Sequence, residues 1–146
     1  MKIKNILKNK GSEVITIRED ATVFDAISTL VQNNIGAVIV TDEGGKVVGI
    51  VSERDILRAS FKDLEGYGNR PVKEIMTRDL LVGEPEDDLE YVETIMTQNR
   101  IRHFPIFSDK KMVGIISVGD VIKHQLSDVS YENRHLKDYI QGKYPG

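Results

Sequence analysis

The sequence twice places a serine three residues before an aspartate, at Ser52 with Asp55 and at Ser117 with Asp120. An ionised carboxylate accepts hydrogen bonds through two oxygens, so each aspartate could bind the two neighbouring hydroxyls of a ribose. Each serine would stand at the start of a helix, where free backbone N–H groups and the positive end of the helix dipole favour a phosphate. The same spacing is also a variant of the capping box, which needs no ligand, and the two roles can coexist.

A phosphate bound at these helix starts would need cations, and the sequence offers them unevenly. Arg100, Arg102 and His103 cluster directly before a strand of the second half, whereas the matching segment 33–36 of the first half has no cation. The first half instead has Arg54 within its Ser-x-x-Asp run. The alternative is that the arginines before the strand form a solvated edge and that Arg54 is a surface residue of its helix. We expect the two sites to differ, with phosphate held better by the second.

The two runs belong to an internal repeat, which is the first feature to seek in a chain of this length. Gly49 and Gly114 precede the two serines by the same three residues, and the repeat distance is 114 − 49 = 65 residues. Each half reads as β-α-β-β-α from its apolar periodicity and turn residues. In the first half we expect strand 14–17, a helix from Thr22 to about Asn33, strands 37–40 and 47–51, and a helix from Ser52 to about Ala59. In the second half we expect strand 80–82, a helix from about Asp88, strands 104–107 and 112–116, and a last helix from Ser117.

A single copy of about 60 residues with a half-covered sheet is marginal in stability, and two copies packed together would bury both sheets. The predicted fold class is therefore α/β (α+β), with two pseudo-symmetric β-α-β-β-α repeats packed sheet to sheet plus a C-terminal helix. The predicted boundaries are 1–60 for the first repeat, 61–71 for the linker, 72–126 for the second repeat and 127–146 for a C-terminal helical extension.

The last helix carries a heptad-like apolar seam beyond Asp120. Its steps from the first residue are 4, 3, 4, 3 and 4, at Ile122, Leu126, Val129, Asn133, Leu136 and Ile140. We expect this seam to join two copies of the chain in a homodimer. The alternative is a helix that folds back on its own domain.

The composition excludes several classes of protein. The chain has 146 residues, no Cys and a net charge of −3, which argues against disulfides, thiolate zinc sites and nucleic-acid binding. The three His show no metal-binding spacing, so no metal is expected. The apolar runs are too short to span a membrane, and Lys8 and Lys10 interrupt the N-terminus before any signal core, so we expect a cytoplasmic protein.

These residues together resemble the CBS domain pair, or Bateman module, over roughly residues 1–126. The resemblance lies in the Gly-[Ile/Val]-[Ile/Val]-Ser-x-x-Asp runs at 49–55 and 114–120, Asn-Ile-Gly-Ala at 34–37 and Arg-His-Phe-Pro at 102–105. The chain looks like the short stand-alone bacterial members. The resemblance implies an adenosyl ligand, since relatives such as the gamma subunit of AMP-activated protein kinase bind AMP, ADP or ATP and others bind NAD or S-adenosylmethionine. It also implies that Arg102 and His103 contact phosphate.

The family pattern further implies that each adenine slot draws on both repeats, as an apolar slot with backbone groups to read the base. The Asp120 site would use the segment around Ser12 to Ile15 together with Phe104. The Asp55 site would use Gly36, Ala37 and Val38 together with the segment from Met76 and Thr77 to Leu81. The alternative for each of these residues is ordinary sheet packing.

Three functions compete. The first is a regulatory module without catalytic activity that needs no cofactor, binds an adenine nucleotide, with AMP or ADP favoured, and signals to an unidentified protein partner by a change of shape. The second is an enzyme, but the barrel of inosine monophosphate dehydrogenase cannot fit in this chain and its cysteine nucleophile is absent. The third is a structural or oligomerisation protein with vestigial clefts.

Overall fold

The computed structural model describes residues 1–11 and 13–127. Two predictions lie outside these residues. They are the contact of Ser12 with a ligand base and the part of the C-terminal seam from Val129 onward. The helices are α1 (Ile3–Lys10), α2 (Val23–Asn33), α3 (Glu53–Lys62), α4 (Leu89–Asn99) and α5 (Val118–Ser127), and the strands are β1 (Thr16–Arg18), β2 (Ala37–Thr41), β3 (Val47–Ser52), β4 (His103–Ser108) and β5 (Lys111–Ser117).

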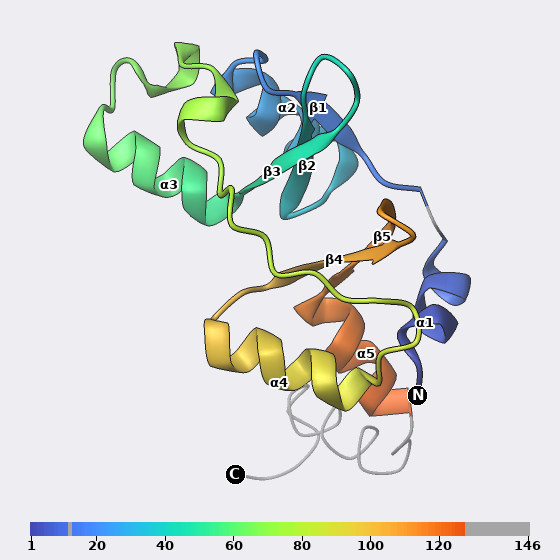
Figure 1. Ribbon diagram of the computed structural model, residues 1–146. Helices are drawn as coiled ribbons and strands as arrows, with labels where there is room; N and C mark the ends of the chain where they lie inside the picture. Colours follow the sequence, from blue (N-terminus) through green and yellow to red (C-terminus); the bar gives the residue numbers. More distant parts are fainter. Residues whose placement is uncertain (12, 128–146) are drawn as a thin grey trace, which may run out of the picture.

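The strands form two small sheets, one in each half of the molecule (Figure 1). The first has the order β1-β2-β3, with β1 parallel to β2 and β2 antiparallel to β3. The second is the antiparallel pair β4-β5. The Asp42–Lys46 turn joins β2 to β3, as its Asp and Gly residues predict.

The two sheets pack face to face. Ala37, Ile39 and Ile50 of the first sheet are buried in one cluster, and the partly buried Met112 and Ile115 of the second sheet pack against it. Side chains alternate along a strand, so this face is the one that points away from the helices. The predicted fold class, two repeats packed sheet to sheet, is confirmed.

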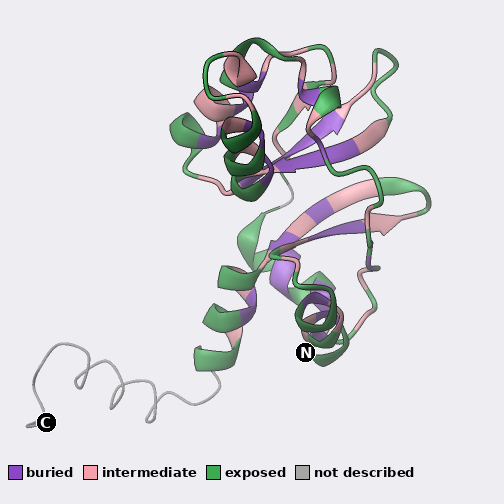
Figure 2. Cartoon of the chain, turned by 90° about the vertical axis from the view of Figure 1, so that its left-hand side faces the viewer, coloured by how far each residue is buried: buried purple, intermediate pink, exposed green. Residues whose placement is uncertain are grey.

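The other face of each sheet is covered by helices, which gives each half its own core (Figure 2). The exposed residues gather on the outer faces of the helices and in the turns. Thr22 and Asp25 close the start of α2 by a capping box, with hydrogen bonds of 3.0 and 3.1 Å in both directions, as the sequence predicts. None of the helices within the described residues is long and apolar enough to cross a membrane.

Helix α1 was not expected from the sequence, and it packs on the second half although it precedes the first. Ile3, Ile6 and Leu7 are buried in the second core, and the Ile3 amide donates to the backbone oxygen of Asp87 at 2.9 Å. The three apolar residues have helical spacing, but a helix of 8 residues, about two turns, is too short to stand out in a sequence. Its stability comes from this long-range packing.

The predicted strand at 80–82 is wrong. The second sheet has no third strand within the described residues, and only an isolated parallel bridge joins Gly83 to Ile106. Leu81 and Val82 are exposed, so burial does not hold them in register beside β4. Of residues 80–82, it is Leu80 that packs in the cluster between the sheets.

Candidate functional site

Each Ser-x-x-Asp run closes the start of a helix that follows the last strand of its repeat. The Ser52 amide and hydroxyl donate to Asp55 Oδ2 at 2.9 and 3.0 Å, and the Asp55 amide donates back to Ser52 Oγ at 3.3 Å. The Ser117 and Asp120 pair has the same bonds at 2.8, 3.0 and 3.1 Å. The capping role predicted as an alternative is therefore present at both positions, and it fixes one oxygen of each carboxylate.

The two carboxylates differ in what reaches them from elsewhere in the chain. Asp55 is 6% exposed, and its Oδ1 accepts a hydrogen bond of 3.1 Å from the Thr77 hydroxyl. Arg58 lies 3.5 Å from the same oxygen. The structure thus brings together the predicted pair of Asp55 and Thr77.

Asp120 is instead contacted by Lys10, whose Nζ lies 2.6 Å from Oδ2. Burial raises the pKa of Asp120, but the hydrogen bonds from Lys10 and Ser117 outweigh this effect and lower the pKa below its ordinary value. The carboxylate therefore stays ionised and available as an acceptor. Lys10 was missed in the sequence because 110 residues separate it from Asp120.

Each site is completed by the segment that leads into the other repeat, and we call these contacts crossed. The Met76–Thr77 segment, which leads into the second repeat, lies against Gly49 and hydrogen-bonds to Ile50 in both directions, at 3.0 and 2.9 Å. Helix α1, which leads into the first repeat, lies against Gly114 through Leu7. Each leading segment thus covers the motif glycine and contacts the aspartate of the other repeat.

The predicted cations lie in different surroundings. His103 pairs with Ser117 across β4 and β5, which places it beside the Asp120 helix start. Burial lowers the pKa of His103, an effect opposed by nearby Glu53, so the imidazole is protonated less readily than a free one. The Arg102 side chain is exposed, and its backbone oxygen accepts from the Val118 amide at 2.9 Å.

Arg54 and Arg100, the other two arginines predicted to contact phosphate, are exposed. Arg100 follows the end of α4 in a left-handed conformation with φ of 55°, as Asn34 follows α2 with φ of 52°. Asn tolerates this conformation better than Arg does. Arg54 is exposed in the first turn of α3, and no ion pair joins its side chain to that of Asp55, which pairs with Arg58 instead.

The residues predicted for the base slots divide between two faces. Gly36 lies beside His103 and Glu53, since a Cβ at Gly36 would lie 3.2 Å from His103 Nε2 and 2.7 Å from Glu53 Oε1. Ala37 faces the space between the sheets. Val38 and Phe104, however, point into the helix-side cores, so a ligand between the sheets would meet only their backbone.

In the two apolar segments before the repeats, the residue that faces the other sheet lies one position before Ile15 and Leu81, which the prediction named. Val14 and Leu80 pack between the sheets, whereas Ile15 packs on the helix side and Leu81 is exposed. Met76 is buried below Gly49 and belongs to the first core. A shift of one residue along an extended segment exchanges the two faces.

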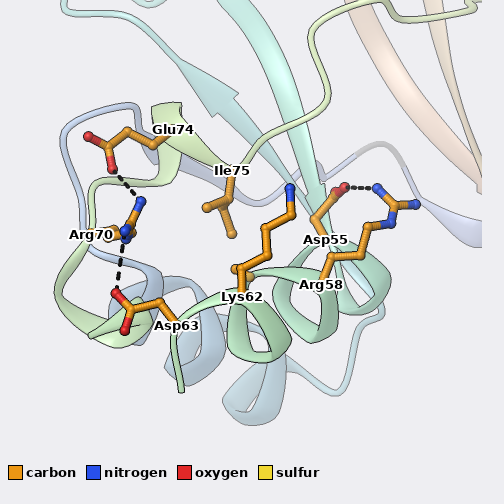
Figure 3. Close-up of a pocket in the computed structure, with 8 residues that line it drawn as sticks. Asp55, Arg58, Lys62, Asp63, Arg70, Glu74 and Ile75 are labelled. Atoms are coloured by element: carbon orange, nitrogen blue, oxygen red, sulfur yellow. Dashed lines mark hydrogen bonds and ion pairs between the residues drawn. The ribbon is translucent and has the colours of Figure 1, made fainter. Parts of the chain in front are cut away.

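A groove of about 310 Å³ lies beside Asp55, between α3 and the segment 70–75 (Figure 3). Arg70 pairs with Asp63 and Glu74 at 3.3 and 3.8 Å. Lys62 points into the groove and, within the described part of the chain, forms no ion pair. The Asp55 side therefore has two cations, Arg58 and Lys62, that were not predicted from the sequence.

Comparison with known proteins agrees with this architecture. The sequence profile of the CBS domain matches residues 4–62 and 72–127. The mitochondrial CBS domain-containing protein CBSX3 of Arabidopsis thaliana is 35% identical over 150 residues, which cover 97% of this chain and 73% of that protein.

Two solved structures are similar over most of the chain. The CBS-domain containing protein ATU1752 from Agrobacterium tumefaciens matches with a TM-score of 0.83 at 35% identity, and the match covers 85% of this chain and 92% of the ATU1752 chain. The CBS domain pair of MJ0100, solved in complex with 5′-methylthioadenosine and S-adenosylmethionine, has a TM-score of 0.77 at 25% identity and covers 88% and 98%. With its two matched repeats and its paired sheets, the chain belongs to the CBS domain family.

Proposed function

We propose that this protein is a regulatory module that binds an adenosyl ligand, with AMP or ADP the favoured ligand, and that it catalyses no reaction. The observation that carries the proposal is the pair of carboxylates, Asp55 and Asp120, each fixed at a helix start and contacted by the segment that leads into the other repeat. The ribose of the ligand would bind there, and the helix start would attract its phosphate. The complex of MJ0100 with two adenosyl compounds supports this ligand class.

A nucleotide phosphate is proposed for the Asp120 site in particular. Arg102 and His103 there take the positions that Gly36 and Ala37 have in the first repeat, since the Val118 amide bonds to the Arg102 oxygen as the Glu53 amide bonds to the Gly36 oxygen, at 2.9 and 3.0 Å. The adenine would lie between the sheets, near Val14 and Ile115.

The signal is proposed to be a change in the contact between the two repeats. Thr77 and Lys10 each contact the aspartate of the repeat that does not follow them. A ligand that binds either aspartate therefore changes a contact that ties the repeats together, and an unidentified protein partner would read this change. The cytoplasmic location expected from the sequence remains part of the proposal.

The test is binding of adenosyl compounds to the pure protein, read from its melting temperature. A ligand that binds only the folded state stabilises it by RT ln(1 + [L]/Kd), about 2.7 kcal/mol at a hundredfold excess over Kd. The second candidate is a structural or oligomerisation protein, which is favoured by the capping bonds that both aspartates already make. That candidate predicts no stabilisation by any ligand.

We also propose a homodimer, supported by a match between exposed apolar residues of α3 and α5. Leu57 and Phe61 correspond to Ile122 and Leu126 at the repeat distance (122 − 57 = 65, 126 − 61 = 65), and all four are exposed. A second copy of the chain would bury both matched stripes at once around a twofold axis. Ile122 and Leu126 also begin the seam predicted for the C-terminal helix.

Phe61→Ser is expected to convert the dimer to monomer. Phe61 is 92% exposed, and losing its burial on both sides of a twofold interface should raise the dimer Kd by at least about a hundredfold. Sedimentation velocity measures the change. Phe24→Ser is the matched control, because Phe24 is exposed on α2 without an apolar counterpart in the second repeat. A monomeric wild-type protein, or a Phe61→Ser dimer as stable as the wild type, would rule out this interface.

A further inference from the structure

Lys10, the last residue of α1, lies before the repeated elements but contacts the aspartate of the second site. Its Nζ lies 2.6 Å from Asp120 Oδ2 and 2.7 Å from the backbone oxygen of Ile115. The Ser117 amide and hydroxyl donate to the same Oδ2. Three donors thus engage Oδ2, while no donor from the described residues reaches Oδ1.

This arrangement affects ligands of different charge differently. Two ribose hydroxyls need two acceptors, so a ribose at Asp120 competes with Lys10 for Oδ2. A ligand with a phosphate offers the displaced ammonium group a new anionic partner. A neutral or cationic ligand offers none, and its binding would break the ion pair without replacement.

The equivalent contact in the first site is neutral. There the crossed segment places the Thr77 hydroxyl, not an ammonium group, on Asp55 at 3.1 Å. The difference between the two crossed contacts is therefore one positive charge.

Packing holds Lys10 in place. Leu7 lies directly against Gly114, where an added Cβ would lie 2.5 Å from Leu7 Cδ2. The Ile3 and Lys4 amides bond to the backbone oxygens of Asp87 and Pro85, both at 2.9 Å. The side chain of Lys10 is 34% exposed and that of Asp120 is 20% exposed, so a ligand phosphate can reach the ammonium group.

We propose that Lys10 makes the Asp120 site select anionic adenosyl ligands over neutral and cationic ones. The inference rests on the proposed function, because it concerns the ligand class of the same site. The class that it assigns is a nucleoside phosphate, whose ribose binds Asp120 and whose phosphate binds Lys10.

The experiment compares the binding of AMP and 5′-methylthioadenosine, which share the adenosine and differ in charge. Calorimetry is carried out on the full chain with Asp55→Asn, which removes the charge of the first site while the second site stays intact. We define the preference for AMP as the Kd of 5′-methylthioadenosine divided by the Kd of AMP. In Lys10→Gln this preference is expected to fall about tenfold or more, because one charge-assisted hydrogen bond to the phosphate is lost.

Two variants serve as controls. Lys8→Gln removes the same charge from the same exposed last turn of α1 and should leave the preference unchanged. Lys10→Arg keeps the charge and should keep the preference. Lys10→Met is a second neutral variant that should repeat the result of Lys10→Gln if the latter folds poorly.

The outcomes separate the inference from the proposed function. If both ligands bind and the preference is the same in Lys10→Gln, Lys10→Met and Lys8→Gln, the inference is overturned and the proposed function stands. If neither ligand binds the wild-type protein, the proposed function fails and the inference fails with it.

Discussion

Asp120→Asn is expected to weaken the binding of AMP about a hundredfold, which corresponds to about 2.7 kcal/mol. The asparagine oxygen can replace Oδ2 in the bonds from Ser117, so the start of α5 remains capped. Its amide group then takes the position of Oδ1 and presents N–H donors, where the ribose hydroxyls need an acceptor. A hydrogen bond to a charged group contributes about 1.5–3 kcal/mol, so one or two such losses give the expected effect.

Isothermal titration calorimetry of the two proteins with AMP measures this change. Asp20→Asn is the matched control, because it removes one charge from an exposed aspartate in the turn after β1 and should leave the Kd unchanged. Circular dichroism confirms that each variant is folded. An Asp120→Asn protein that binds AMP as tightly as the wild type would show that Asp120 caps its helix and contacts no ribose.

Gly49→Ala is expected to lower the free energy of unfolding by about 2 kcal/mol, because overpacking a core costs about 1–3 kcal/mol. The added Cβ would lie 2.7 Å from Met76 Sδ and 2.8 Å from the backbone oxygen of Thr77. The thioether can turn away, but the backbone oxygen is held by the Ile50 amide at 3.0 Å. The segment must therefore move off β3, and the Thr77 bond to Asp55 should be lost with it.

Urea denaturation measures the loss of stability. Gly44→Ala in the β2–β3 turn is the control, since the only atom near its added Cβ would be Asp42 Oδ1 at 3.5 Å and its φ is not positive. The control should stay within about 0.5 kcal/mol of the wild type. Equal stabilities of the Gly49→Ala and Gly44→Ala proteins would show that the segment at Thr77 adapts freely, and the crossed contact would then lose its structural role.

The repeat and most of the fold could be predicted from the sequence because they depend on local patterns. The apolar runs of β2 and β3 and the turn between them follow from residue types within a few positions. The capping boxes at Thr22 and at both serines need only a spacing of three residues. Face-to-face packing follows because one half-covered sheet cannot be stable alone.

The errors have a common cause, which is that the missing information is not local. Lys10 reaches Asp120 through the packing of α1 on a core built more than 80 residues later. The segments that contain Val14 and Leu80 were predicted, but not that these two residues would be the ones to face the other sheet, because an extended apolar segment does not reveal which of its two alternating faces meets that sheet. The surroundings of His103 are likewise not local, because Gly36 and Glu53 of the other repeat lie beside it and burial lowers its pKa.

The crossed contacts also suggest why two repeats occur in one chain. Each aspartate is completed by a segment that belongs to the other repeat, Thr77 at one site and Lys10 at the other. A ligand can then alter the contact between the repeats only when both are present. Coupling between two sites requires a structural element whose state changes when either site is occupied.

The most direct test of an adenosyl-ligand function is the melting temperature of the wild-type protein, freed of co-purified nucleotide, in the presence of AMP, ADP, ATP, NAD, S-adenosylmethionine and 5′-methylthioadenosine, with GMP as the control. We predict a rise in melting temperature with AMP or ADP, no rise with GMP, and loss of the rise with AMP or ADP in Asp120→Ala. A folded protein that no ligand stabilises would contradict this function and would leave helix capping as the role of both Ser-x-x-Asp runs.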